Sequence, residues 1–477
     1  MTRDEADLID ELAAPATIVV PEDLEDLALG DDYALNPDYV DMVIDAADRG
    51  DDERLRELVS ALRSEDVADL MGFLTADYRE QVIPQLDPET LAEVISELDT
   101  NLREEILEAL PSATLARALE EMDSDDAVDV VEDLEDDKRE QVLAALDQTD
   151  RAAIETALGY EDETAGRLMQ REVLAAPSFW TVGQTIDHVQ SAGDDLPELF
   201  FDIYIVDPSY KPTGAVPVSR LLRASRESSL AEIMEPVTEI DVEMDQEEVA
   251  YIFDKYHLIS APVTDAGGRL VGQITVDDIV GVIQEETEED ILALAGVSDA
   301  GRDADVLGIA RSRLPWLVVN TLTAALAASV IGAFQAEIAK LVTLAILMPI
   351  VASLGGNAGT QTLAVAVRAL ASRELTAANS LRIVFREMGV GVINGLVLAT
   401  IMGAAVFVFF HDLMLCVTIG LALIINLFIA SLAGILVPLA LDRLGRDPAV
   451  SSSVFVTFVT DFMGFLSFLG LAGLILL

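Results

Sequence analysis

The chain has 477 residues, 51% of them hydrophobic, and a formal net charge of −56. All of the excess negative charge lies in residues 1–314, because residues 315–477 carry seven basic and seven acidic side chains. Phosphate backbones are bound by Lys and Arg, so such an acidic surface excludes nucleic acid as a partner. Because Lys occurs only four times, we interpret most of the charge as adaptation of the surface to salt.

Residues 1–54 form an acidic N-terminal segment that contains no apolar stretch typical of a secretory signal. We therefore expect the front part of the chain to lie in the cytosol. Cys416 is the only cysteine, so the chain can form no internal disulfide.

Residues 55–160 carry a repeat of twelve residues, marked by an apolar side chain at each step. The marks are Leu74, Leu86, Leu98, Leu110, Met122, Leu134 and Leu146. Turn sequences between them, such as Asp87-Pro88, predict one short helix per unit. Pairs of such helices stack into a solenoid, which is usually a docking surface or a lever.

A second pattern, of strands between helices, occurs twice, in residues 165–226 and 227–286. The stretch "IYIVDPSYKPTGAVPVSRLL" parallels "APVTDAGGRLVGQITVDDIV". This duplication resembles a tandem pair of CBS domains, which often bind adenine nucleotides. The resemblance implies a nucleotide contact, with ATP as a candidate ligand, from Thr275 and Asp278; the first copy has Pro217 and Arg220 instead, and a purely structural pair is the alternative.

Residues 287–314 are predicted to form a connecting helix between the CBS pair and the following apolar region. Its start is rich in carboxylates, which divalent cations could bridge, so we interpret it as a control helix that leads to the membrane. A plain solvated linker is the alternative interpretation.

Residues 315–477 contain five apolar runs, each near or above the roughly 20 residues that a membrane-spanning helix needs. The runs are Pro315–Phe334, Leu341–Val367, Gly389–Phe410, Leu413–Pro438 and Val450–Leu477. With the N-terminus inside, the inner flanks carry eight Arg residues, whereas the outer flanks carry only Lys340. This bias predicts a multi-pass protein of the cell membrane with its N-terminus in the cytoplasm and its C-terminus outside.

Polar residues inside two of these runs are the candidate transport residues. Asp461 lies near the middle of the fifth run, where an ionisable residue has a functional role by default. Thr457 and Ser453 share its helical face. The second run contains "MPIVASLGGNAGTQT", whose Gly356, Asn357, Thr360 and Gln361 form a second polar patch; close packing of small residues would explain its glycines but not its amides.

These oxygen ligands suit a hard cation that keeps most of its water, as Mg²⁺ does. One carboxylate per chain favours a symmetric homodimer, in which two copies of Asp461 would balance one divalent ion.

At this level the chain resembles the MgtE family of magnesium channels and transporters. Two motifs carry the resemblance: Pro349, Gly355, Gly356, Asn357, Gly359 and Gln361 in the second span, and Asp447, Pro448, Ala449, Ser452, Thr457, Asp461 and Gly464 around the fifth. The implied fold is multidomain: an all-α superhelical repeat domain, an α/β tandem CBS pair and an all-α five-helix transmembrane domain.

The resemblance also implies that cytosolic Mg²⁺ closes the pore by bridging acidic residues of the cytosolic domains. The positions that match the family's sensor acids are Asp278, Glu286, Glu289 and Asp290. Gly281, His257 and Val454 depart from the family pattern, which leaves open the number of sensor ions and the local geometry of the fifth helix.

Two other functions compete with magnesium transport. The same path could carry Mn²⁺, Co²⁺ or Ni²⁺, or the spans could only anchor a CBS sensor of nucleotide or metal. Polar groups at mid-membrane favour transport over an anchor. We do not expect an enzyme, because the sequence offers three His, one Cys and no arrangement of nucleophile and base.

Overall fold

The computed structural model describes residues 24, 27–30, 33–192, 196, 199–295, 297, 306–375 and 380–476. The chain divides into two compact units, Met1–Val280 and Gly281–Leu477, which we describe separately.

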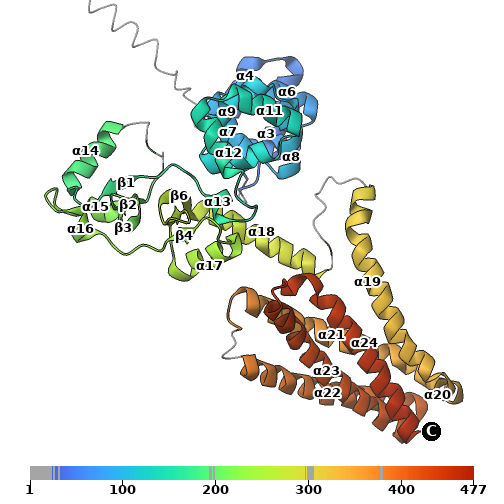
Figure 1. Cartoon of the computed structure of the whole chain (residues 1–477). Helices are drawn as coiled ribbons and strands as arrows, with labels where there is room; N and C mark the ends of the chain where they lie inside the picture. Colours follow the sequence, from blue (N-terminus) through green and yellow to red (C-terminus); the bar gives the residue numbers. More distant parts are fainter. Residues whose placement is uncertain are drawn as a thin grey trace, which may run out of the picture. The chain divides into compact units, whose positions relative to one another are not determined.

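The first unit begins with a domain of short helices (Figure 1). They are α3 (Pro37–Arg49), α4 (Asp52–Val59), α5 (Ser64–Phe73), α6 (Ala76–Val82), the 3₁₀ turn η1 (Ile83–Gln85), α7 (Pro88–Glu97), α8 (Thr100–Ala109), α9 (Ser112–Leu119), α10 (Ser124–Glu132), α11 (Asp136–Ala145) and α12 (Gln148–Ala157). Alternate helices pack together, α5 on α7, α7 on α9 and α9 on α11. This is the stacking of a solenoid, in which each unit completes its core against its neighbours.

The repeated apolar residues explain where these helices end. Leu74, Leu98, Leu110 and Leu146 each follow the last helical residue and turn into one continuous core. The packing starts before residue 55, because α3 and α4 place side chains in the same core. Ion pairs tie successive repeats, with Arg79 bound to Glu105 at 2.9 Å and Arg103 to Asp133 at 2.6 Å.

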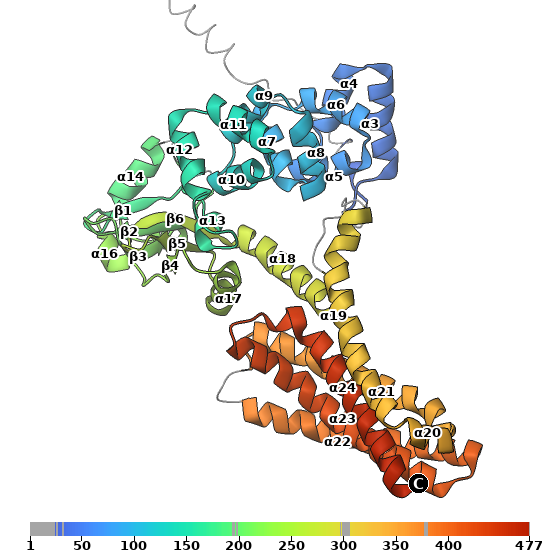
Figure 2. The ribbon, with the colours of Figure 1, turned by 45° about the vertical axis from the view of Figure 1, so that its right-hand side comes forward.

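The CBS pair follows, and its two copies have the same topology (Figure 2). The elements are α13 (Ala165–Leu168), β1 (Ala175–Pro177), α14 (Val182–Ala192), β2 (Asp202–Val206), β3 (Pro212–Pro217), α15 (Val218–Leu221), α16 (Leu230–Ile233), β4 (Ile240–Asp241), α17 (Gln246–Tyr256), β5 (Ser260–Thr264) and β6 (Leu270–Thr275). In each sheet the first strand runs parallel to the second, and the third runs antiparallel to it. The duplication predicted from the sequence is therefore present in the fold.

Equivalent glycines allow other segments to approach the third strand of each sheet. A Cβ atom on Gly214 would lie 2.6 Å from the Glu235 carbonyl oxygen, and one on Gly272 would lie 2.6 Å from that of Gln170. The residues that follow the glycines, Ala215 and Gln273, pair with the approaching segments, so a side chain at either glycine would have to move the backbone.

The second unit contains the long helices of the membrane domain. They are α19 (Val306–Ala333), the short α20 (Gln335–Lys340), α21 (Thr343–Ala371), α22 (Ser380–Phe410), α23 (Leu413–Arg443) and α24 (Pro448–Ile475). Five of the described helices are long and apolar enough to cross a membrane, as predicted. Helix α23 is the centre of the packing, because it contacts α21, α22 and α24.

The connecting segment differs from the single helix expected over 287–314. Helix α18 (Val276–Leu294) begins directly after β6, well before residue 287, and α19 begins at Val306. Most of the residues between them lie outside the described part of the chain. The early start reflects local capping, since the Asp278 carboxylate bonds the Thr275 amide at the head of α18.

Replacing Gly272 by Ala should destabilise the CBS pair by about 2 kcal/mol, because the new methyl group must displace backbone rather than a flexible side chain. Faster hydrogen exchange of the β5 and β6 amides in the full-length protein would show this. Gly281→Ala is the matched control, since nothing lies within 4 Å of its Cβ position and Ala favours the helix. Equal exchange in both variants would contradict the packing argument.

Candidate cation site and acidic clusters

A cavity of about 340 Å³ in the second unit contains the central candidate residue. Asp461, Thr457 and Ser453 line it from α24, and Asn320 and Thr323 line it from α19. Asp461 is partly buried and lies halfway along α24. The structure thus brings together three of the predicted pore residues and adds two from α19, which the sequence motifs did not single out.

The second polar patch lies on α21, which continues through Pro349 as one helix. Asn357, Thr360 and Gln361 are exposed on this chain and do not line the cavity of Asp461. Thr360 donates a hydrogen bond to the Gly356 carbonyl at 3.0 Å, inside its own helix. The single chain therefore keeps the two predicted halves of the path apart.

Asn426 of α23 explains why two positions of the motifs are glycine, although no sequence motif singled it out. Its side chain is fully buried, and its Nδ2 donates to the Val351 carbonyl of α21 at 2.9 Å. A Cβ on Gly355 would lie 2.1 Å from this nitrogen, and one on Gly464 would lie 2.9 Å from it. These two glycines therefore let α21 and α24 pack against the Asn426 amide.

An acidic cluster in the first unit lies between α10 and the start of α18, and its members are Asp125, Asp126, Asp277 and Asp278. Asp278 accepts a hydrogen bond from the Thr275 hydroxyl at 2.7 Å. The pKa of Asp278 is raised to about 7, chiefly by burial. The Thr275 hydrogen bonds lower this pKa, whereas the charges of Asp277 and Asp126 raise it. The predicted sensor acid therefore lies among other carboxylates.

Asp125 of α10 is the most enclosed member of this cluster. It is only 8% exposed, and its Oδ1 has no hydrogen-bond partner in the described residues. Burial raises the pKa of Asp125 well above its ordinary value, and the nearby charges of Asp278 and Asp126 act in the same direction. The sequence contained Asp123-Ser124-Asp125 as a turn signal, but nothing in that pattern showed which carboxylate it would face.

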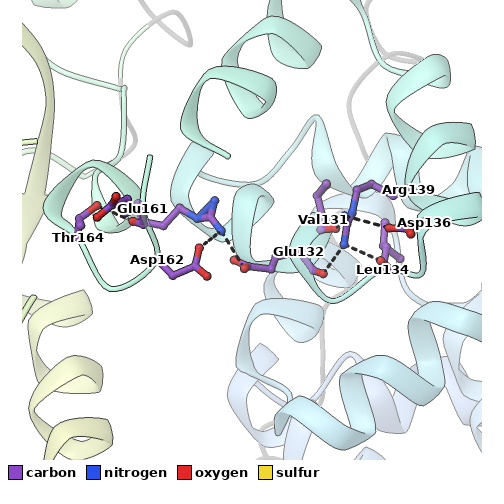
Figure 3. Close-up of polar contacts among 9 residues, drawn as sticks. Val131, Glu132, Leu134, Asp136, Arg139, Glu161, Asp162 and Thr164 are labelled. Carbon is purple, nitrogen blue, oxygen red and sulfur yellow. Dashed lines mark hydrogen bonds and ion pairs between the residues drawn. The ribbon is translucent and has the colours of Figure 1, made fainter. Parts of the chain in front are cut away.

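Hydrogen bonds and ion pairs hold α10 beside the CBS pair despite this crowding of like charges. Arg167 pairs with Glu132 of α10 at 2.8 Å and with Asp162 at 2.7 Å. Figure 3 shows the Glu132 and Asp162 side chains at this contact. At the other end of α10, the Ser124 hydroxyl donates to Glu172 at 2.7 Å. Attraction at both ends of α10 therefore opposes the repulsion between its acidic face and α18.

A second group of carboxylates lies entirely in the second unit. Burial raises the pKa of Asp290 to about 6, and the next contributions come from the charges of Asp447, Glu286 and Glu289. One turn farther along, Ala293 packs against Leu363, Val367, Ala449 and Val456 of α21 and α24. The four predicted sensor residues thus fall into two groups, with Asp278 in one and Glu286, Glu289 and Asp290 in the other, where Asp290 also senses Asp447.

Neither group is a preformed metal site in this structure. Within the described ranges, no three His, Cys, Asp or Glu side chains are arranged so that they could hold a metal ion. Thr275, the predicted nucleotide contact, directs its hydroxyl to Asp278 of the same helix head. A ligand for either role would have to engage side chains that now interact with each other.

Comparison with known proteins matches three parts of the chain to family models. Residues 348–471 match a family model described as a divalent cation transporter, MgtE; residues 62–163 match the MgtE intracellular N domain, and residues 230–285 match a CBS domain.

Two curated relatives are each 35% identical to this chain. The magnesium transporter MgtE of Thermus thermophilus aligns over 338 residues, which are 69% of this chain and 74% of that protein. The magnesium transporter MgtE of Enterococcus faecalis aligns over 309 residues, 65% of this chain and 68% of that protein. A solved structure of the cytosolic domain of the Mg²⁺ channel MgtE in complex with ATP matches 51% of this chain and 99% of its own, with 33% identity and a TM-score of 0.49. This chain belongs to the MgtE family of divalent cation transporters.

Proposed function

We propose that this protein is a homodimeric, Mg²⁺-selective channel or transporter of the cell membrane, which cytosolic Mg²⁺ closes. The observation that carries the proposal is the cavity lined by Asp461, Thr457 and Ser453 midway along α24. Six water molecules occupy about 180 Å³ at roughly 30 Å³ each, so a hydrated Mg²⁺ has room in about 340 Å³. A carboxylate with hydroxyls can hold such an ion through its water shell.

Exposed polar side chains on α21 support the dimer. Asn357, Thr360 and Gln361 lie on a helix long enough to cross the membrane, yet this chain alone leaves them uncovered. Polar groups at that depth are stable when they face water or a protein partner rather than lipid. A two-fold partner would enclose them and bring a second Asp461 toward the ion.

The two acidic groups support closure by cytosolic Mg²⁺. In the first, Asp125 and Asp126 of α10 crowd Asp278; in the second, Asp290 crowds Asp447. A divalent cation between such carboxylates would replace repulsion by coordination. It would hold α10 against the CBS pair, and it would hold the end of α18 against α21 and α24, where Ala293 already packs.

The orientation and the nucleotide site belong to the same proposal. Basic residues at the predicted inner flanks favour a cytoplasmic N-terminus and an external C-terminus. ATP is the proposed nucleotide for Thr275 and Asp278, and its ribose would have to compete with their mutual hydrogen bond. The rival functions, transport of Mn²⁺, Co²⁺ or Ni²⁺ and anchoring of a sensor, are tested by the experiments below.

Replacing Asp461 by Asn should abolish Mg²⁺ uptake into liposomes that contain the full-length protein, because the path loses its fixed charge at mid-membrane. Asp442→Asn is the matched control, since it removes the same charge from the exposed end of α23 and should leave uptake within about twofold. Parallel assays with Mn²⁺, Co²⁺ and Ni²⁺ measure selectivity. Unchanged uptake in Asp461→Asn would eliminate the proposed path, and no uptake by the native protein would favour the anchored sensor.

Replacing Asp278 by Asn should weaken closure, because a bridging carboxylate is lost. We expect the Mg²⁺ concentration that halves the open fraction in patch recordings to rise about tenfold, the effect of roughly 1.4 kcal/mol of lost binding. Asp69→Asn, on an exposed face of α5, should leave that concentration unchanged. If both variants close like the native protein, Asp278 is no part of the sensor.

The contact between α10 and α18 should also loosen as the pH rises when Mg²⁺ is removed by a chelator. The pKa of Asp278 in the closed contact is about 7, above its ordinary value of 3.8. The free-energy cost of ionising Asp278 in this contact therefore grows as the pH rises from 3.8 to 7, and it is complete above pH 7. Hydrogen exchange of α10, corrected for its intrinsic pH dependence, should therefore be faster at pH 8 than at pH 6. Added Mg²⁺ should remove the difference, and a contact equally protected at both pH values without Mg²⁺ would contradict the assignment.

A further inference from the structure

Helix α19 brings a polar face to the cavity of Asp461. Asn320, Thr323 and Ala324 line it, and their spacing of three and four residues places them on one side of the helix. Asn320 is the fifteenth of the 28 residues of α19, and Asp461 is the fourteenth of the 28 residues of α24. The two side chains therefore occupy comparable positions along two helices that pack together.

The threonines of α19 near the cavity bond to their own helix, whereas the Asn320 side chain, within the described range of that helix, does not. The Thr321 hydroxyl donates to the Leu317 carbonyl at 2.7 Å, and the Thr323 hydroxyl donates to the Asn320 carbonyl at 2.9 Å. Both threonines are thus satisfied by their own helix. The Asn320 side chain is exposed and makes no hydrogen bond with the residues that the structure describes, so its amide must find partners outside this chain or in water.

An amide at this depth is unfavourable against lipid and favourable against a wet path. Helix α19 is apolar enough to cross a membrane, so the Asn320 amide is an exception within it. Packing alone would be served by Ala or Leu. Because Asn320 lines the same cavity as Asp461, we infer that its amide acts in that cavity.

We propose that Asn320 forms the second wall of the cation site and accepts a hydrogen bond, through its side-chain oxygen, from a water molecule of the hydrated ion. This rests on the proposed function, since it assigns a further residue to the same path. Asp461 supplies the charge on one wall, and Asn320 supplies a neutral oxygen on the other. A neutral partner selects the water shell of Mg²⁺ without adding a charge that would slow its release.

The test measures uptake into liposomes by full-length Asn320→Leu, with Thr321→Val as the matched control from the same helix. Losing one hydrogen bond to the hydrated ion should lower Mg²⁺ uptake about tenfold. It should also reduce the preference for Mg²⁺ over the larger Ca²⁺. Thr321→Val should behave like the native protein, because its hydroxyl serves only the helix.

Asn320→Asp gives a readout that a packing role would not produce. An additional carboxylate in each chain should lower the Mg²⁺ concentration for half-maximal uptake several-fold and slow the maximal rate, since the ion is bound more tightly. Asn320→Gln, which keeps the amide, should retain more uptake than Asn320→Leu.

The outcomes separate this inference from the proposed function. If Asp461→Asn abolishes uptake while Asn320→Leu and Asn320→Asp match the native protein, the inference is wrong and the proposed function stands. If Asp461→Asn has no effect, the proposed function itself is wrong. Should Asn320→Leu fail to fold, as judged by its elution in detergent, the concentration dependence of Asn320→Asp decides: an unchanged value overturns the inference.

Discussion

The cost of placing a polar group in hydrocarbon governs the organisation of the membrane unit. A carboxylate at the depth of Asp461 is stable only beside water, a cation or a protein partner, so α24 cannot face lipid with that side. The cavity between α19 and α24 meets this requirement with polar side chains from both helices. The uncovered amides of α21 impose the same requirement on a second surface, which is why one chain is an incomplete path in the proposed dimer.

Close packing provides the rigidity that such a site needs. The buried Asn426 amide occupies space that a side chain would fill at Gly355 or Gly464, and it bonds to a carbonyl of α21. Gly359 likewise admits Val456 of α24, whose Cγ1 would lie 2.7 Å from a Cβ at this position. These glycines of both motifs thus permit close contact between helices, which is the packing interpretation of the glycines.

Periodicity made the helices predictable, whereas contacts between distant segments were not. The twelve-residue repeat and the five apolar runs predicted helices because each depends on local spacing, and Asp461 stood out because its surroundings are apolar. Three residues were missed because their roles depend on distant parts of the chain. Asp125 faces Asp278, which is more than 100 residues away. Asn320 shares a cavity with α24, and Asn426 packs between two other helices. The bounds of α18 and α19, Val276–Leu294 and Val306–Ala333, also differ from the helix predicted over 287–314.

The balance of forces on α10 bears on how a small ion could control a large protein. Arg167 and Ser124 attract the two ends of the helix to the CBS pair, while Asp125 and Asp126 are repelled by the head of α18. Because these opposing terms act on the same helix, only their difference decides whether it stays in contact. A difference of about 1.4 kcal/mol changes an equilibrium tenfold, so where the opposing terms nearly cancel, one coordinated divalent ion would reverse the balance. An acidic face without the Arg167 pair would separate whenever Mg²⁺ left, and an ion pair without the acidic face would never respond to it. The proposed control by Mg²⁺ therefore requires both.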